Sequence, residues 1–83
     1  MDIGVELSLY PLRDQYLPPI EQFIAKLQGH PGLRVVTNSM STQIFGPYEQ
    51  VWALLAEQLQ GTFREHGKAV FVMKVLGPLA AGP

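Results

Sequence analysis

The chain contains no cysteine and few charged residues. None of its 83 residues is cysteine and only 16% are charged, where about 25% is usual. The absence of cysteine excludes disulfide bridges, thiolate metal ligands and thiol nucleophiles, although it says little about the compartment. The net charge of −1 provides no electrostatic footprint for a nucleic acid, so we expect no such partner.

Long apolar runs and clusters of ligating side chains are also missing. No run approaches the roughly 20 residues that span a bilayer, and the N-terminus lacks the basic and apolar regions of a signal peptide. We therefore expect no membrane partner and a cytoplasmic location. We interpret His30 as a solvated turn residue and His66 as a favourable charge near a helix C-terminus. Neither histidine has a ligand at metal spacing, and no glycine-rich phosphate loop or Ser-His-acid order is present, so we predict no metal, cofactor or catalytic residue.

Apolar residues, in contrast, make up 47% of the chain. A chain of this length forms one domain and buries only about 60–65% of its unfolded surface. The combination of many apolar and few charged side chains therefore predicts further burial against another chain.

Hydrophobic periodicity predicts six elements of secondary structure. Alternation of apolar residues from Ile3 to Leu9 is typical of a strand with one buried face. The spacing of Ile20, Phe23, Ile24 and Leu27 is typical of one helical stripe. By the same criteria, we expect strands at 3–10, 33–38, 41–45 and 68–76 and helices at 18–28 and 47–65.

The resulting βαββαβ order, with right-handed crossovers, predicts a ferredoxin-like α+β sandwich. Its four-stranded antiparallel sheet has the order 4-1-3-2, and two helices cover one face. We expect residues 1–77 to form this single domain and residues 78–83 to be a flexible C-terminal tail.

The second face of such a sheet has no cover from this chain. By alternation it carries three residues of the first strand and three of the third: Glu6, Ser8, Tyr10, Ser41, Gln43 and Phe45. The fourth strand is apolar on both faces, which is typical of strands with a layer on each side. We therefore predict a homo-oligomer, a dimer or tetramer, in which another protomer supplies the second layer.

Each polar residue on these strands has a structural and a functional interpretation. Glu6 could pair with Lys74 across the sheet or accept hydrogen bonds from a ligand. Tyr10 could pack at an interface or stack on a ligand. Ser41 and Thr42 could satisfy nearby backbone groups or donate to a ligand.

Two segments add a family resemblance. The first, Ser8-Leu9-Tyr10-Pro11-Leu12 followed by Asp14, resembles the opening strand of the thiamine/hydroxymethylpyrimidine-binding YkoF-like family. The second, Met40-Ser41-Thr42-Gln43-Ile44-Phe45-Gly46, resembles the third strand of that family. The resemblance extends over residues 3–77 and identifies the chain as similar to single-domain members.

The resemblance implies a non-enzymatic protein that binds thiamine or its hydroxymethylpyrimidine moiety, in an oligomer packed through its sheets. We expect the heterocycle to lie near six residues: Glu6, Ser8, Tyr10, Asn38, Ser41 and Thr42. A tyrosine ring can stack on the pyrimidine, hydroxyls can donate to ring nitrogens, and a carboxylate or amide oxygen can accept from the amine. The alternatives are a small dimeric ferredoxin-like oxygenase or isomerase, and an assembly module without a ligand.

Overall fold

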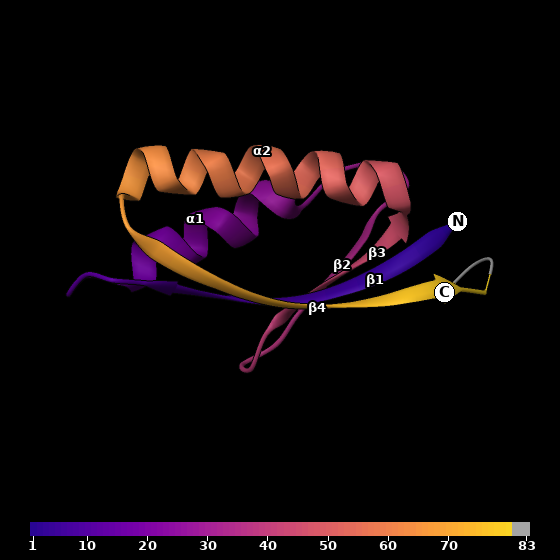
Figure 1. Cartoon of the computed structure of the whole chain (residues 1–83). Coiled ribbons are helices and arrows are strands. Elements are labelled where there is room, and N and C mark those ends of the chain that lie inside the picture. The colour runs from indigo at the N-terminus through magenta and orange to yellow at the C-terminus, as the bar shows by residue number, and fades with distance from the viewer. Residues whose placement is uncertain (81–83) are drawn as a thin grey trace.

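A computed structural model describes residues 1–80 as one sheet with a layer of two helices. The elements, in chain order, are β1 (Asp2–Pro11), α1 (Leu17–Leu27), β2 (Arg34–Thr37), β3 (Thr42–Pro47), α2 (Tyr48–His66) and β4 (Ala69–Leu79). All neighbouring strands are antiparallel, in the order β2-β3-β1-β4. Both helices lie on the same face (Figure 1). This confirms the predicted ferredoxin-like α+β fold and its strand order.

The ends of the predicted elements differ slightly from those in the structure. The largest difference is at β4, which continues to Leu79 although the periodicity predicted an end at residue 76. The strand therefore includes the first two residues of the segment expected to be a tail. Residues 81–83 of that segment lie outside the described residues.

The core lies between the sheet and the helices. It consists of ten buried apolar side chains from β1, β3, α1 and α2: Ile3, Val5, Leu7, Leu9, Phe23, Leu27, Ile44, Val51, Leu54 and Leu55. β1 contributes every second residue from Ile3 to Leu9, as the alternation predicted. Phe71 and Met73 of β4 are partly buried and pack against this cluster. The edge strand β4 therefore covers one side of the core.

Local signals explain where the helices begin and end. Pro18 lies in the first turn of α1, where the backbone N–H groups have no helical partner. Gly29 and Gly67 follow the two helices with φ of 78° and 80°, a conformation that glycine adopts without steric cost. Among residues 1–80, neither helix is long and apolar enough to cross a membrane.

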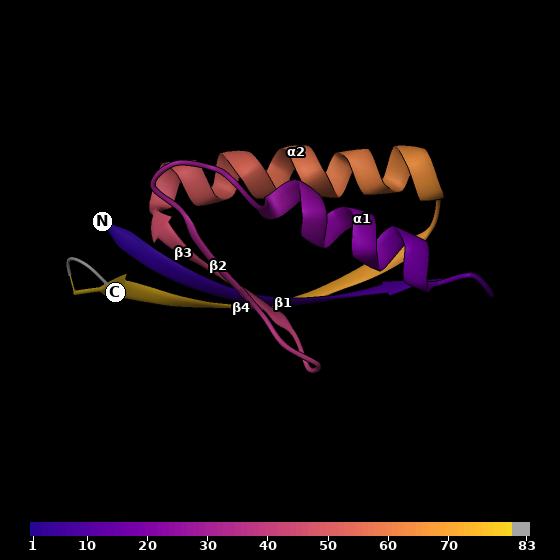
Figure 2. The same ribbon diagram turned by 180° about the vertical axis from the view of Figure 1, so that it is seen from behind.

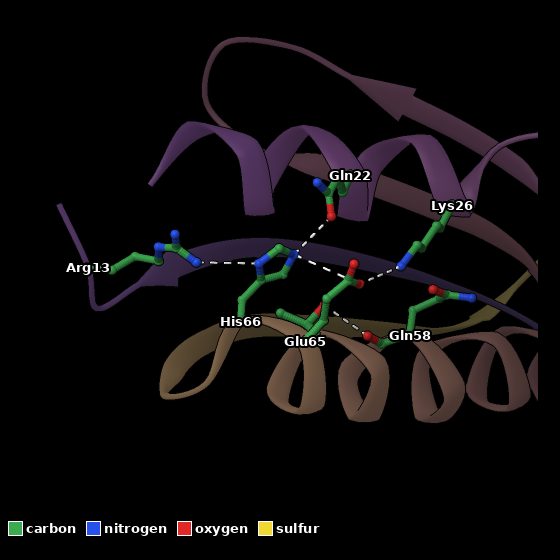
Figure 3. A network of polar contacts seen from close by, with 7 residues as sticks. Arg13, Gln22, Lys26, Gln58, Glu65 and His66 are labelled. Carbon is green, nitrogen blue, oxygen red and sulfur yellow. Dashed lines mark hydrogen bonds and ion pairs between the residues drawn. The ribbon is translucent and has the colours of Figure 1, made fainter. Parts of the chain in front are cut away.

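Polar contacts join the two helices at the C-terminal end of α2 (Figure 3). Lys26 of α1 forms an ion pair of 3.1 Å with Glu65. The Nε2 atom of His66 lies 2.9 Å from Oε1 of Gln22, and its Nδ1 atom lies 3.5 Å from a guanidinium nitrogen of Arg13. The side chain of His66 is only 12% exposed. The histidine interpreted from the sequence as a helix-end charge therefore also links α2 to α1 and to the loop after β1.

No segment of residues 1–80 covers the opposite face of the sheet (Figure 1). In the β1–β4 register, Ser8 lies opposite Val72, and Tyr10 lies opposite Val70. Val72 is 53% exposed and Leu76 is 66% exposed, as expected for apolar residues on a bare face. Val75, which is opposite the core residue Val5 in the register, is also half exposed because β4 is an edge strand.

Candidate functional site

The candidate site lies where β1 and β3 separate. The pairing of β1 with β3 ends at Leu7 and Thr42, whereas the pairing of β1 with β4 continues to Pro11 and Ala69. Beyond Leu7, β1 therefore has a neighbour on one side only. The hairpin between β2 and β3 projects away from the sheet on the side opposite the helices (Figure 2). Because β3 leaves β1 at this point, a gap opens beside β1.

A cavity of about 190 Å³ occupies this gap. One wall is the segment Leu7–Tyr10 of β1, and the hairpin residues 38–42 form another. The apolar side is formed by three residues of the stripe on α1: Ile20, Phe23 and Ile24. Five of the six residues predicted from the sequence line this cavity: Ser8, Tyr10, Asn38, Ser41 and Thr42. The fold therefore brings together residues from β1 and from the hairpin that are about 30 positions apart in the chain.

Glu6, the sixth predicted residue, does not line this cavity. Its Oε2 atom accepts hydrogen bonds from Oγ of Ser41 at 3.1 Å and from Nε2 of Gln43 at 3.3 Å. Lys74 is opposite Glu6 in the register, but the two side chains do not form an ion pair in the structure. The carboxylate thus binds to β3, and the cross-strand pair with Lys74 that the sequence allowed is absent.

A second depression, on the uncovered face, does include Glu6. It has a volume of about 260 Å³, and six residues line it: Glu6, Ser8, Met40, Ser41, Val72 and Lys74. Ser8 and Ser41 also line the cavity under α1. These two serines therefore lie between a cavity on the helical side and a depression on the bare side.

Asn38 fixes the shape of the hairpin. Its Oδ1 atom accepts hydrogen bonds from the backbone N–H of Met40 at 2.8 Å and of Ser41 at 3.1 Å. The backbone N–H of Asn38 donates to the carbonyl of Ser41 at 3.1 Å. The side-chain oxygen expected to accept from a ligand amine is thus engaged in the turn, and the NH₂ group of Asn38 remains as a donor.

Thr42 lies on the helical side of the sheet. It is 5% exposed, and its hydroxyl oxygen is 3.4 Å from that of Thr37 on β2. Ser41, the preceding residue, points to the other face, where it contacts Glu6. Consecutive residues of a strand point to opposite faces, so the predicted set cannot surround one ligand on one face. The members of this set come together only where β1 and β3 separate.

The apolar half of the cavity was not predicted from the sequence. Ile20 and Ile24 were interpreted only as part of the apolar stripe of the helix, but both are partly exposed and line the cavity. A contribution of the main chain of β1 to the cavity was not predicted either. The only titratable side chain among the lining residues is that of Tyr10. A cavity of hydroxyl, amide and apolar groups is suited to hold a small neutral molecule, and its side chains offer few groups for proton transfer.

No protein-family model and no curated protein matches this sequence. Solved structures do match it. Protein SP2199 from Streptococcus pneumoniae has a TM-score of 0.86 at 22% sequence identity, over 95% of this chain and 89% of that one. MJ1052 from Methanocaldococcus jannaschii has a TM-score of 0.80 at 18% identity, over 98% of this chain and 84% of that one.

One similar structure carries a functional description. TM0486 from Thermotoga maritima, provisionally described as a thiamine biosynthesis/salvage protein, has a TM-score of 0.80 at 14% identity. The match covers 90% of this chain and 82% of that one. At these identities the likeness establishes the fold alone, because one fold supports many functions.

Proposed function

We propose that the protein is a non-enzymatic binder of thiamine or of its hydroxymethylpyrimidine moiety. The cavity between β1, α1 and the hairpin is the observation on which this proposal rests. It combines an apolar side from α1 with hydroxyl and amide groups on the opposite side. Ligand sites are commonly apolar with a few polar groups that fix orientation.

The size of the cavity favours the pyrimidine moiety. Its volume of about 190 Å³ is below the roughly 300–1,000 Å³ of pockets for drug-sized ligands. A single substituted ring suits this space better than the two linked rings of thiamine. The description of TM0486 as a thiamine biosynthesis/salvage protein supports the same class of ligand.

Isothermal titration calorimetry with hydroxymethylpyrimidine and with thiamine tests this proposal. We expect heat of binding with the pyrimidine. Ile20→Trp should abolish it, because the indole fills the cavity from α1. Ala25→Trp introduces the same side chain at an exposed position of the same helix and should leave binding intact. No heat at millimolar concentration with either compound would reject the proposal and favour an assembly module without a ligand.

We also propose that the protomers pack through the uncovered faces of their sheets. Tyr10, Val70, Val72 and Leu76 are each between 45% and 66% exposed on that face. Several large apolar side chains exposed on one face of a soluble protein are typical of an interaction surface. A second sheet would bury these side chains and complete the layer that the chain lacks.

A further inference from the structure

The main chain of β1 beyond Leu7 has one edge without a strand. The backbone N–H of Leu12 donates to the carbonyl of Lys68, next to β4, at 3.2 Å. The backbone groups of successive residues in a strand point alternately to its two neighbours. The N–H and C=O groups of Leu9 therefore point away from β4, toward the side that β3 has left.

Leu9 has no hydrogen-bond partner on that side among the described residues. The register with β3 ends at Leu7, and the backbone hydrogen bonds of the hairpin include none to Leu9. Leu9 is only 8% exposed and it lines the cavity. Buried backbone donors and acceptors are almost always paired, with protein groups or with ordered water, so the N–H and C=O groups of Leu9 are free to pair with water or with a ligand in the cavity.

We infer that the N–H and C=O groups of Leu9 form a two-point docking edge for a planar heterocycle with an acceptor nitrogen next to an amino group. This inference rests on the function proposed above and adds the element that recognises the ligand. The ring nitrogen accepts from the N–H of Leu9, and the neighbouring amine donates to its C=O. The same exchange joins two opposed residues of an antiparallel ladder.

The surroundings of Leu9 favour a small ring over a peptide strand. Ile20, Phe23 and Ile24 of α1 supply apolar contacts to a ring that lies beside β1. The hairpin residues 38–42 line the opposite side, and the volume of about 190 Å³ suits one ring. An aminopyrimidine places a ring nitrogen and an exocyclic amine on adjacent atoms, which matches the two groups of Leu9.

The test combines a backbone variant with a ligand variant. The 83-residue chain can be synthesised with an ester in place of the Ser8–Leu9 amide, which removes the N–H of Leu9 and keeps every side chain. The control carries an ester before Asp14, in the exposed loop. Each is titrated with hydroxymethylpyrimidine and with the analogue in which carbon replaces the ring nitrogen next to the amine.

Each change alone should weaken binding about two- to tenfold, the effect of one neutral hydrogen bond. Together they should weaken it no further than either alone, because both remove the same bond. The control ester should bind as the all-amide protein does. Unchanged affinity of the Leu9 ester, or losses that add, would overturn the inference while leaving the proposed function in place. If the all-amide protein binds no pyrimidine, both are overturned.

Nuclear magnetic resonance of the unmodified protein gives an independent result if the ester variant fails to fold. The Leu9 amide proton should move downfield when hydroxymethylpyrimidine is added, because it gains a hydrogen bond. The Tyr10 amide, which points toward β4, should shift little. Equal shifts at both amides, or none at Leu9, would also overturn the inference.

Discussion

At the scale of single residues, two glycines differ in the space that surrounds them. A Cβ atom at Gly46 would overlap the side chain of Leu33 and lie 3.0 Å from the carbonyl of Gly32. A Cβ atom at Gly61, inside α2, would have no neighbour within 4 Å. Gly46 therefore allows Leu33 and Gly32 to pack closely against the end of β3. At Gly61 a methyl group would meet no neighbour, and a glycine at this position lowers the stability of the helix.

The two glycine-to-alanine variants should therefore change stability with opposite sign. Gly46→Ala should lower the free energy of unfolding by about 1–3 kcal/mol, the usual effect of overpacking. Gly61→Ala should raise it by roughly 0.5–1 kcal/mol, because alanine is the better helix former. Urea denaturation followed by circular dichroism measures both, and a stabilising Gly46→Ala would contradict the packing at Leu33.

A threonine pair separates ligand contact from stability. Thr37 and Thr42 share one hydroxyl contact of 3.4 Å, but only Thr42 lines the cavity. Thr42→Val and Thr37→Val remove the same contact. We expect only Thr42→Val to weaken hydroxymethylpyrimidine binding in calorimetry, by about 0.5–1.5 kcal/mol. Equal losses of affinity would mean that the hydroxyl of Thr42 does not face the ligand.

At the scale of elements, α1 has two roles. One of its sides faces α2 through Gln22 and Lys26 (Figure 3). Another side lines the cavity with Ile20 and Ile24. The contacts that attach α1 to α2 therefore also set the position of the cavity wall.

The ion pair between α1 and α2 makes a specific prediction for acid. The hydrogen bond and charge of Lys26 hold the pKa of Glu65 below its usual value. A carboxyl whose pKa is lower in the folded state stabilises it above the unfolded pKa, and this stabilisation is lost as the pH falls through the folded pKa. The pair is exposed, so its contribution is small. In Lys26→Met, carbon-detected titration of Glu65 should give a higher midpoint than in the parent protein. An unchanged midpoint would exclude the pair in solution.

His66 should matter more to stability than that exposed pair. His66→Ala removes the partner of Gln22 at 2.9 Å from a largely buried position, so the free energy of unfolding should fall by about 0.5–1.5 kcal/mol. Arg13→Ala removes only a contact of 3.5 Å at an exposed residue and should change it less. Thermal unfolding of both variants tests the order, and an Arg13 effect larger than that of His66 would contradict it.

The elements were predictable from the sequence because each depends on neighbouring residues. Alternation from Ile3 to Leu9 and the stripe on α1 fixed the type of element and the face that it buries. The separation of β1 from β3 was not predictable, because it depends on two registers that end at different residues of β1. Alternation along β3 already implied that Ser41 and Thr42 point to opposite faces. The predicted site nevertheless included both residues.

At the scale of the whole molecule, the bare sheet face is the surface through which we propose that the protomers pack. Val72→Asp should convert the proposed oligomer to a folded monomer, because a carboxylate at the interface would be buried without a partner. Val72 is 53% exposed in the protomer, so the fold should survive. Ala53→Asp, on the exposed side of α2, is the matched control. Light scattering with circular dichroism tests this, and a parent protein that is monomeric at micromolar concentration would contradict it.

The strand order has a consequence for the time course of folding. β1 precedes the other described elements in the chain, yet its two neighbours are β3 and β4, and β4 follows all the other described elements. Until residues 69–79 emerge, β1 lacks one whole edge, and the core lacks Phe71 and Met73. Contacts between such distant segments form slowly, because a long loop must close before they contribute. During synthesis, the edge of β1 that pairs with β4 therefore stays unpaired until residues 69–79 have been made, even after both helices and β3 have formed.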